Sequence, residues 1–298
     1  MSGRPLRTYG LLVLVVVIWG SYPALVKLAL RDMPPFTLAA LRCSLASALL
    51  AGLLWRAGAA ADWPISRPDL PSIVVLGLAG IVMSTGTFYL AIARTTAANA
   101  VILTATTPVF VAMGGHLFFG ERLRRRQWAG VLCSAAGVLL TVTRGRLEVL
   151  EAPPHAGDGI ALVGQVGWAA YTLYGKRAMA RLSPQAATAG AYLVGTAVLI
   201  PVAVILAPVF PAGSPPTRWG SWTAWAVVLF QGIVGTFSHV WYYRGVRDVG
   251  PSVTAIFMNL QPLVGVALAA LLVGETVGPA QVLGVVLILA GVGLTTRR

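Results

Sequence analysis

The 37 residues from Pro108 to Arg144 are similar to a second stretch at the end of this chain, 154 positions later. Thirteen of the 37 positions are identical without a gap. They include a proline, a Gly-Glu pair and a glycine-rich run, which fall on Pro262, Gly274-Glu275 and residues 284–295 in the second copy. A shared apolar composition would not produce this agreement. We therefore interpret it as an internal repeat, which restricts the fold to two similar units.

The chain has too few polar residues to cover a water-soluble surface. Of its 298 residues, 57% are hydrophobic and only 10% are charged, whereas soluble domains carry about 25% charged residues. We therefore predict an all-α integral membrane protein. Its two cysteines, Cys43 and Cys133, lie in apolar segments. They are predicted to be small core residues, with no disulfide framework and no metal site.

Ten stretches are long and apolar enough to cross a bilayer, which takes about 20 residues. They fall near residues 9–30, 36–55, 70–93, 97–118, 126–143, 158–179, 185–207, 221–243, 251–272 and 278–295. This divides the chain into two five-helix repeats, residues 1–147 and 148–298, with a linker at 144–157. Arg4 and Arg7 precede the first stretch as in a signal peptide, but the stretch is too long for one, so we expect it to be retained.

Basic residues predict the orientation of these spans. With the N-terminus in the cytoplasm, 15 of the 22 lysines and arginines lie inside and seven lie outside, Arg42 among the seven. Both termini are then cytoplasmic. Because five spans per repeat is an odd number, the second repeat is inverted, and the basic loop Arg122–Arg126 becomes the uncharged loop Thr276–Ala280. Inverted repeats are typical of transporters, with the substrate site near the midplane between the halves.

These features resemble the drug/metabolite transporter (DMT) superfamily, in its EamA-type branch of ten-helix permeases. The resemblance rests on the repeat, on Pro108 and Pro262 with the Gly-Glu pair after each, on the glycine-rich last helix of each half, and on Trp19-Gly20-Ser21. It covers nearly the whole chain, which is similar to YddG-type amino-acid exporters. The resemblance implies one central cavity lined by spans 1, 3, 4, 6, 8 and 9, and outward transport across the bacterial inner membrane.

Aromatic side chains in the first and sixth spans are candidates to face that cavity. Trp19 and Tyr22 in one span align with Trp168 and Tyr171 in the other, and Gln165 lies on the same helical face. Tryptophan and tyrosine are also enriched at membrane interfaces. However, Trp19 and Trp168 lie about ten residues into their spans, which favours a cavity or a helix contact.

The eighth and third spans add a polar stripe. The eighth carries Gln231, Ser238, His239 and Tyr242, and the aligned stretch of the third carries Ser84, Thr85 and Phe88. Polar groups are costly in hydrocarbon unless they face protein or water. For His239 two interpretations stay open. It is either a hydrogen-bonded structural residue, or a contact for substrate or protons, because imidazole changes its charge near neutral pH.

Prolines interrupt the fourth and ninth spans. Proline lacks an N–H, so Pro108 frees the carbonyl of Thr104 and Pro262 frees that of Met258. The polar residues beside these breaks are Thr104, Asn259 and Gln261. They could bind a polar group of the solute, or they could satisfy the freed backbone, as membrane helices require. Asn259 is the strongest single candidate, because an amide in mid-span is expensive.

The missing motifs narrow the function. All nine acids lie in loops or near span ends, so no carboxylate marks a proton relay in mid-membrane. We expect Glu121 and Glu275 to bind the exposed N–H groups of the helix that follows each. No phosphate loop, zinc spacing or Ser-His-Asp set is found, so neither an ATP-driven pump nor an enzyme is indicated, and no cofactor is expected. No buried guanidinium is evident either, which favours a zwitterionic or neutral solute.

The sequence predicts a secondary transporter that exports small metabolites by alternating access, amino acids with aromatic or apolar side chains included. One alternative is efflux of lipophilic cations, which requires an acid in the cavity, with Asp158 as a weak candidate. Another is a passive solute channel. The expected partners are a small-molecule substrate and the lipid bilayer, not nucleic acid. The chain is expected to be a monomer or a homodimer. The glycine faces of the fifth and tenth spans let helices approach closely, so these spans are expected to be scaffold, with a dimer contact as the alternative.

Overall fold

The computed structural model describes residues 3–56, 66–119, 124–143, 145, 156–206, 217–249, 254, 257–258 and 260–296. Within these ranges every regular element is a helix and no strand occurs. The elements are α1 (Gly3–Ala29), α2 (Pro35–Arg56), η1 (Arg67–Asp69), α3 (Leu70–Leu76), η2 (Gly77–Gly86), α4 (Thr87–Arg94), α5 (Ala97–Thr104), α6 (Thr107–Phe119), α7 (Arg125–Thr143), α8 (Ala156–Ala178), α9 (Pro184–Leu206), α10 (Trp222–Asp248), α12 (Gln261–Leu268), η4 (Ala269–Val273) and α13 (Pro279–Thr296).

Each of the ten predicted stretches contains one or more of these helices. The third runs without a break from η1 to α4, the fourth is divided into α5 and α6, and the ninth includes α12 and η4. In the described part of the chain, six helices are long and apolar enough to cross a membrane, namely Arg7–Ala29, Pro35–Arg56, Arg67–Arg94, Ala97–Phe118, Pro184–Leu206 and Trp222–Asp248. The all-α membrane class is therefore supported by the lengths and the composition of the helices.

Large apolar side chains stay exposed along these helices. Val13, Leu14 and Val17 in α1 and Val204 and Ile205 in α9 are each between 47% and 69% exposed. Soluble proteins rarely leave such contiguous apolar surface uncovered. In a bilayer the same side chains face the acyl chains, so these surfaces need no protein partner.

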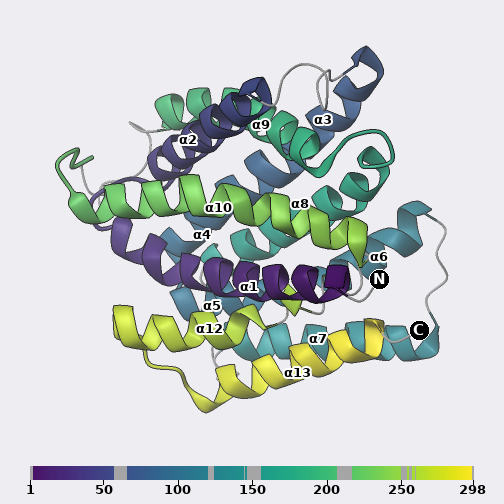
Figure 1. The fold of residues 1–298 in the computed structure, drawn as a ribbon. Helices are drawn as coiled ribbons and strands as arrows, with labels where there is room; N and C mark the ends of the chain where they lie inside the picture. Colours follow the sequence, from purple (N-terminus) through teal and green to yellow (C-terminus); the bar gives the residue numbers. More distant parts are fainter. Residues whose placement is uncertain are drawn as a thin grey trace.

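The helices α7 and α13 pack along each other at one edge of the bundle (Figure 1). Their contact is reciprocal. A Cβ built on Gly137 would lie 2.8 Å from the backbone nitrogen of Ile288, and one built on Gly291 would lie 2.6 Å from that of Ser134. Gly291 and Ile288 are the copies of Gly137 and Ser134 at the 154-residue shift. Equivalent residues that exchange partners in this way are what a two-fold relation produces.

This reciprocal contact fits the scaffold role expected of the glycine faces. Gly137, Gly284 and Gly291 lie between α7 and α13 of one chain, where they let the backbones approach closely. The homodimer stays a prediction. Gly293 is different, because a Cβ built there would have nothing within 4 Å.

Equivalent positions of the two halves also meet in the centre. The hydroxyl groups of Ser47 in α2 and Thr196 in α9 lie 2.9 Å apart and are 149 positions apart in the chain, the shift that relates Trp19 to Trp168. Around them α2 packs along α9, and α1 packs along α10. The main buried cluster is built from α1, α2, α3, η2, α4, α5, α8, α9 and α10, so the interior of the bundle draws on both halves of the sequence.

The turn between α4 and α5 is held by charged side chains from distant parts of the chain. The two carboxylate oxygens of Glu275 accept hydrogen bonds from the backbone N–H groups of Ala97, at 2.8 Å, and Ala98, at 2.9 Å. Glu275 thus binds the N-terminus of α5, not that of α13, which follows it. The prediction that it binds helix N–H groups is confirmed, but the predicted helix is wrong, since the fold brings α5 closer. Glu121 lies outside the described residues.

We expect Glu275→Ala to lower the free energy of unfolding by about 1–2 kcal/mol, the usual cost of losing an N-terminal cap. The substitution leaves two N–H groups of α5 without their side-chain acceptor. Thermal denaturation of the detergent-solubilised protein would measure the loss. Glu275→Gln is the matched control, since it keeps one acceptor oxygen and should lose less. An unchanged melting midpoint for Glu275→Ala would show that this contact does not stabilise the fold.

Candidate substrate site

Four side chains form a compact group in the middle of the bundle, which we call the aromatic cluster: Trp19, Trp168, His239 and Tyr242. They come from α1, α8 and α10. The centroid of the Trp19 ring lies 5.2 Å from that of Trp168, 4.8 Å from that of His239 and 5.3 Å from that of Tyr242. The Trp168 ring also contacts Tyr242, at 5.3 Å. Three helices from both halves of the chain therefore converge here.

The polar edge of the aromatic cluster is hydrogen-bonded. The indole nitrogen of Trp19 donates to the hydroxyl of Ser238 at 2.5 Å, and that hydroxyl donates to the carbonyl of Gly235 at 2.6 Å. A buried indole N–H normally finds such a partner. The indole rings of Trp19 and Trp168 pack against other helices, and neither residue lies at an end of its own helix. A position at the membrane interface therefore does not describe these two residues.

The hydrogen-bond partners of the His239 imidazole belong to the protein. Its Nδ1 lies 2.8 Å from the carbonyl oxygen of Gly235, which can only accept, so Nδ1 carries a hydrogen. The hydroxyl of Tyr192 lies nearly equally far from both ring nitrogens, 3.3 Å from Nδ1 and 3.4 Å from Nε2. These contacts favour the hydrogen-bonded structural alternative for His239.

The other candidates from α8 and α10 differ in their surroundings. The ring of Tyr171 contacts the aromatic cluster, with 5.0 Å between its centroid and that of Trp168, and it stacks on Tyr243 at 4.9 Å. Gln165 accepts a hydrogen bond from the hydroxyl of Thr107 at 2.7 Å and so lies at the break between α5 and α6. Gln231 accepts from the hydroxyl of Tyr89.

The third span contributes through Thr85. The hydroxyl of Thr85 accepts a hydrogen bond from Arg42 at 3.3 Å and donates to the carbonyl of Gly80 at 3.2 Å. Phe88 packs against Tyr89, with 5.8 Å between ring centroids, and Ser84 is buried. Thr85 is therefore the candidate of this span that contacts Arg42, a buried charged residue described below.

The residues beside the prolines satisfy the protein's own groups. The carbonyl of Thr104, which Pro108 frees, accepts from the hydroxyl of Thr107 at 2.9 Å. The hydroxyl of Thr104 donates to the carbonyl of Val101 at 2.7 Å. The amide of Gln261 lies 3.2 Å from the sulfur of Met258. These contacts favour the backbone-satisfying alternative for Thr104. Asn259 lies outside the described residues.

The largest difference from the sequence prediction is Arg42. Its side chain is only 3% exposed, so the prediction that no guanidinium is buried is wrong. Arg42 is the eighth residue of α2, which begins at Pro35, and at about 1.5 Å per residue it lies roughly 10 Å along the helix. The count of basic residues assigns it to the outer side of the membrane. The sequence signal for its burial is that it is a single charged residue inside an otherwise apolar predicted span.

Asp158 is buried but lies elsewhere. Its carboxylate accepts hydrogen bonds from the hydroxyl of Thr95 and from the amide of Asn99. Asn99 in turn accepts from the amide of Gln281 at 2.6 Å. Asp158 therefore belongs to the network that supports the turn between α4 and α5. It does not contact the aromatic cluster.

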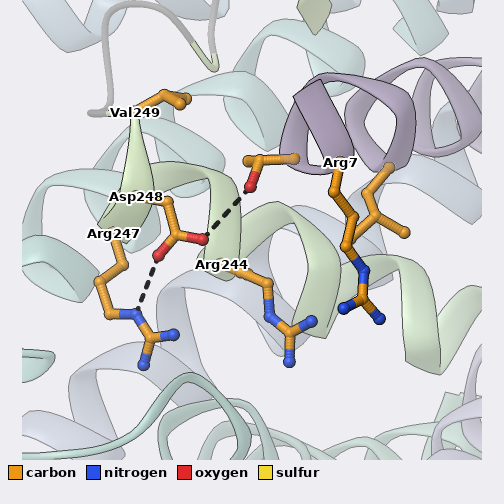
Figure 2. Close-up of a pocket in the computed structure, with 7 residues that line it drawn as sticks. Arg7, Arg244, Arg247, Asp248 and Val249 are labelled. Atoms are coloured by element: carbon orange, nitrogen blue, oxygen red, sulfur yellow. Dashed lines mark hydrogen bonds and ion pairs between the residues drawn. The ribbon is translucent and has the colours of Figure 1, made fainter. Parts of the chain in front are cut away.

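A pocket of about 510 Å³ opens between the N-terminal end of α1 and the C-terminal end of α10. Three arginines and one acid line it, together with smaller groups: Arg7, Thr8, Leu11, Arg244, Arg247, Asp248 and Val249. The carboxylate of Asp248 accepts hydrogen bonds from the hydroxyl of Thr8 and from Nε of Arg247, each at 3.3 Å. The side chains of Arg7 and Arg244 extend beside them (Figure 2). The pocket is basic and lies at the helix ends, away from the aromatic cluster.

Comparison with known proteins places this architecture among transporters. The model of the EamA-like transporter family matches residues 6–143 and 155–297. An uncharacterized transporter of Archaeoglobus fulgidus is 32% identical over 98% of both chains. The uncharacterized inner membrane transporter YedA of Escherichia coli K12 is 26% identical, over 98% of this chain and 91% of that one. A probable amino-acid metabolite efflux pump of Salmonella typhimurium is 30% identical, over 94% of this chain and 92% of the pump.

A solved crystal structure gives the same result for the fold. It is 21% identical, has a TM-score of 0.65, and the match covers 97% of this chain and 96% of that chain. At this identity the likeness bears on the fold alone. It indicates that the helical arrangement described above is one that a natural protein adopts over its whole length.

Proposed function

The chain belongs to the EamA-like transporter family, and on that premise we propose that it exports amino acids, those with aromatic or apolar side chains included, by alternating access. The observation that carries the proposal is the aromatic cluster, in which Trp19 and Trp168 lie 5.2 Å apart at equivalent positions of the two halves. Alternating access requires a site between two halves that rock against each other. Aromatic faces at that point suit a ring or an aliphatic side chain.

We further propose that the ten spans form two inverted five-helix repeats, residues 1–147 and 148–298. The reciprocal contacts of α7 with α13 support this relation, and so does the pairing of Ser47 with Thr196. Both marked ends of the chain lie at the same end of the bundle (Figure 1), as an even number of spans requires. A chain of this kind reverses direction between its halves, so the two repeats are related by a two-fold axis in the plane of the membrane.

For the orientation we propose a plasma membrane location with both termini in the cytoplasm. YedA, one of the relatives, is named an inner membrane transporter. The excess of basic residues on the inner side also becomes larger, because Arg42 is buried within α2 and no longer belongs to the outer group of seven. The basic pocket around Arg7 and Arg244 then lies on the cytoplasmic side, where Lys and Arg accumulate.

Amino acids are favoured over lipophilic cations as substrates. A cation exporter is expected to present an acid to its solute. Among the described residues no acid contacts the aromatic cluster, and Asp158 is bound by Thr95 and Asn99. One relative, the Salmonella protein, is named a probable amino-acid metabolite efflux pump. A passive channel is the second alternative, and it differs in kinetics.

Counterflow in proteoliposomes with a panel of labelled amino acids tests the proposal. We expect saturable exchange of one or a few members of the panel, driven by unlabelled amino acid on the opposite side. Flux that rises linearly with concentration, together with ionic conductance, would identify a channel instead. If the folded protein exchanges no amino acid but transports a lipophilic cation, the result would indicate drug efflux instead.

We expect His239→Gln to keep the pH dependence of wild-type exchange. Nδ1 of His239 lies 2.8 Å from the carbonyl of Gly235, and the rings packed on the imidazole are those of Trp19, Trp168 and Tyr192, none of which is an acid. Glutamine can replace one donor and one acceptor without a titrating group. The measurement is the rate of exchange between about pH 5 and 8, the range in which histidine titrates. A pH profile that flattens in the variant would assign proton coupling to His239.

A further inference from the structure

Arg42 is a buried cation without a counter-ion in the part of the chain that the structure describes. No acidic side chain there pairs with it, and its Nη2 donates a hydrogen bond to the hydroxyl of Thr85. Its Nε and Nη1 are buried and have no partner. The guanidinium carbon lies 6.0 Å from the ring centre of Tyr22 and 5.7 Å from that of Tyr192. These rings stabilise its charge from the faces, but they leave the N–H edge unbonded.

Two more unbonded donors point to the same place. The hydroxyl of Tyr22 and the amide nitrogen of Gln231 are also buried without a partner. A Cβ built on Gly235 would collide with the Tyr22 hydroxyl and would lie 3.6 Å from Nη1 of Arg42. Gln231 lies one turn before Gly235 on the same face of α10. Arg42, Tyr22 and Gln231, which we call the donor cluster, therefore gather from α2, α1 and α10.

An unbonded buried donor is costly, and an unpaired buried guanidinium is more so. Every unbonded atom of the donor cluster can donate a hydrogen bond. A carboxylate offers two oxygens with several acceptor positions, so it can accept from the guanidinium and from the neighbouring donors at once, and such charge-assisted hydrogen bonds are stronger than neutral ones. The group that complements the donor cluster is therefore an anion with two adjacent oxygens, and not a cation or an uncharged apolar group.

The donor cluster lies next to the aromatic cluster. Tyr22 follows Trp19 by three residues on α1, so both side chains share one helical face. The ring of Tyr192 packs on Arg42 at 5.7 Å and on His239 at 5.4 Å, and so lies between the two groups. A solute with its apolar part against Trp19 and Trp168 would place a terminal carboxylate toward Arg42.

We infer that the donor cluster binds the carboxylate of the transported solute, with Arg42 as its main partner and Tyr22 and Gln231 as additional donors. This inference rests on the proposed function, because it assigns one end of the solute of that same site. It also replaces the expectation of a site without charge. The site selects organic acids and zwitterions and rejects derivatives that lack the carboxylate.

The test compares an amino acid with its own amide, which keeps the ring and the amino group but lacks the carboxylate. The full-length protein is purified in detergent, and binding of each probe is measured by calorimetry. The probes are the amino acid that exchanges fastest in counterflow and its amide, or L-phenylalanine and L-phenylalaninamide if none exchanges. We expect the wild type to bind the acid at least about tenfold more tightly than the amide, as suits charge-assisted hydrogen bonds.

Variants then assign that preference to Arg42. Arg42→Gln should remove the preference for the acid. Arg31→Gln is the matched control, because it removes the same charge from an exposed residue in the turn after α1, and it should keep the preference. Equal binding of acid and amide by the wild type, or a preference that survives Arg42→Gln, would overturn the inference. Acid binding without any exchange would instead leave the site standing and refute the transport proposal.

Tyr22→Phe provides a second test, which does not depend on how Arg42→Gln folds. It removes one buried hydroxyl that has no partner, so it should leave the melting temperature unchanged or raise it. It should nevertheless weaken binding of the acid several-fold and leave binding of the amide nearly unchanged. A purely structural role for Tyr22 predicts the reverse, a loss of stability with no change in the preference for the acid, and that result would contradict the inference.

Discussion

Gly291→Val is expected to prevent the chain from folding to a monodisperse protein. A Cβ at position 291 would lie 2.5 Å from the carbonyl oxygen of Gly130 and 2.6 Å from the backbone nitrogen of Ser134. Both obstacles are backbone atoms of α7, so no side-chain rotation can make room. The two helices would have to separate along their shared face. Overpacking of this kind costs about 1–3 kcal/mol when side chains can move, and we expect a larger cost here.

Gly293→Val is the matched control for this prediction. It places the same side chain two residues further along α13, where a Cβ has nothing within 4 Å. It should give wild-type yield and a wild-type melting temperature. Size-exclusion profiles and thermal unfolding in detergent compare the two variants directly. Equal behaviour of Gly291→Val and Gly293→Val would show that α7 and α13 do not pack through these glycines.

Trp168→Ala is expected to lower exchange of the preferred amino acid by about tenfold or more, because the truncation of a buried aromatic anchor commonly costs about 2 kcal/mol or more in binding. The ring of Trp168 contacts Trp19, His239 and Tyr242 within 5.2–5.8 Å. Its removal opens the centre of the aromatic cluster and takes away one of the two faces available to the solute. Counterflow at several concentrations measures both the affinity and the maximal rate.

Trp222→Ala serves as the control for Trp168→Ala. Trp222 is the first residue of α10 and is 77% exposed, as suits a side chain at the membrane interface. Its loss should leave exchange unchanged. The melting temperature of each variant separates a fold defect from a site defect. Full exchange by a stable Trp168→Ala protein would remove the aromatic cluster from the transport mechanism.

Much of the helical framework could be predicted because it depends on local properties. Runs of apolar residues long enough to cross a bilayer have only the helix available to satisfy their backbone, and each of the ten predicted stretches contains a helix. The depth of Trp19 and Trp168 in their spans indicated an interior position for both. The repeat indicated that α7 and α13 are equivalent. It did not indicate that they pack against each other.

The surroundings of individual polar groups could not be predicted in the same way. Span position suggested that Arg42 belonged to an outer loop and that Glu275 would bind the next helix. In the structure Arg42 faces Tyr22 and Tyr192, and Glu275 binds α5, 178 positions away in the chain. Gln165, which shares a helix with Trp168, bonds Thr107 at the break between α5 and α6. In each case the partner is remote in sequence.

A bundle of membrane helices with two related halves follows from the sequence alone, because bilayer thickness and the helical period act on consecutive residues. Which polar groups meet depends on the tertiary structure. A hydrogen bond or an ion pair depends on a separation of a few ångströms between atoms that the chain brings together from far apart. A buried arginine with unbonded donors becomes visible as a binding group only when its neighbours on α1 and α10 are known.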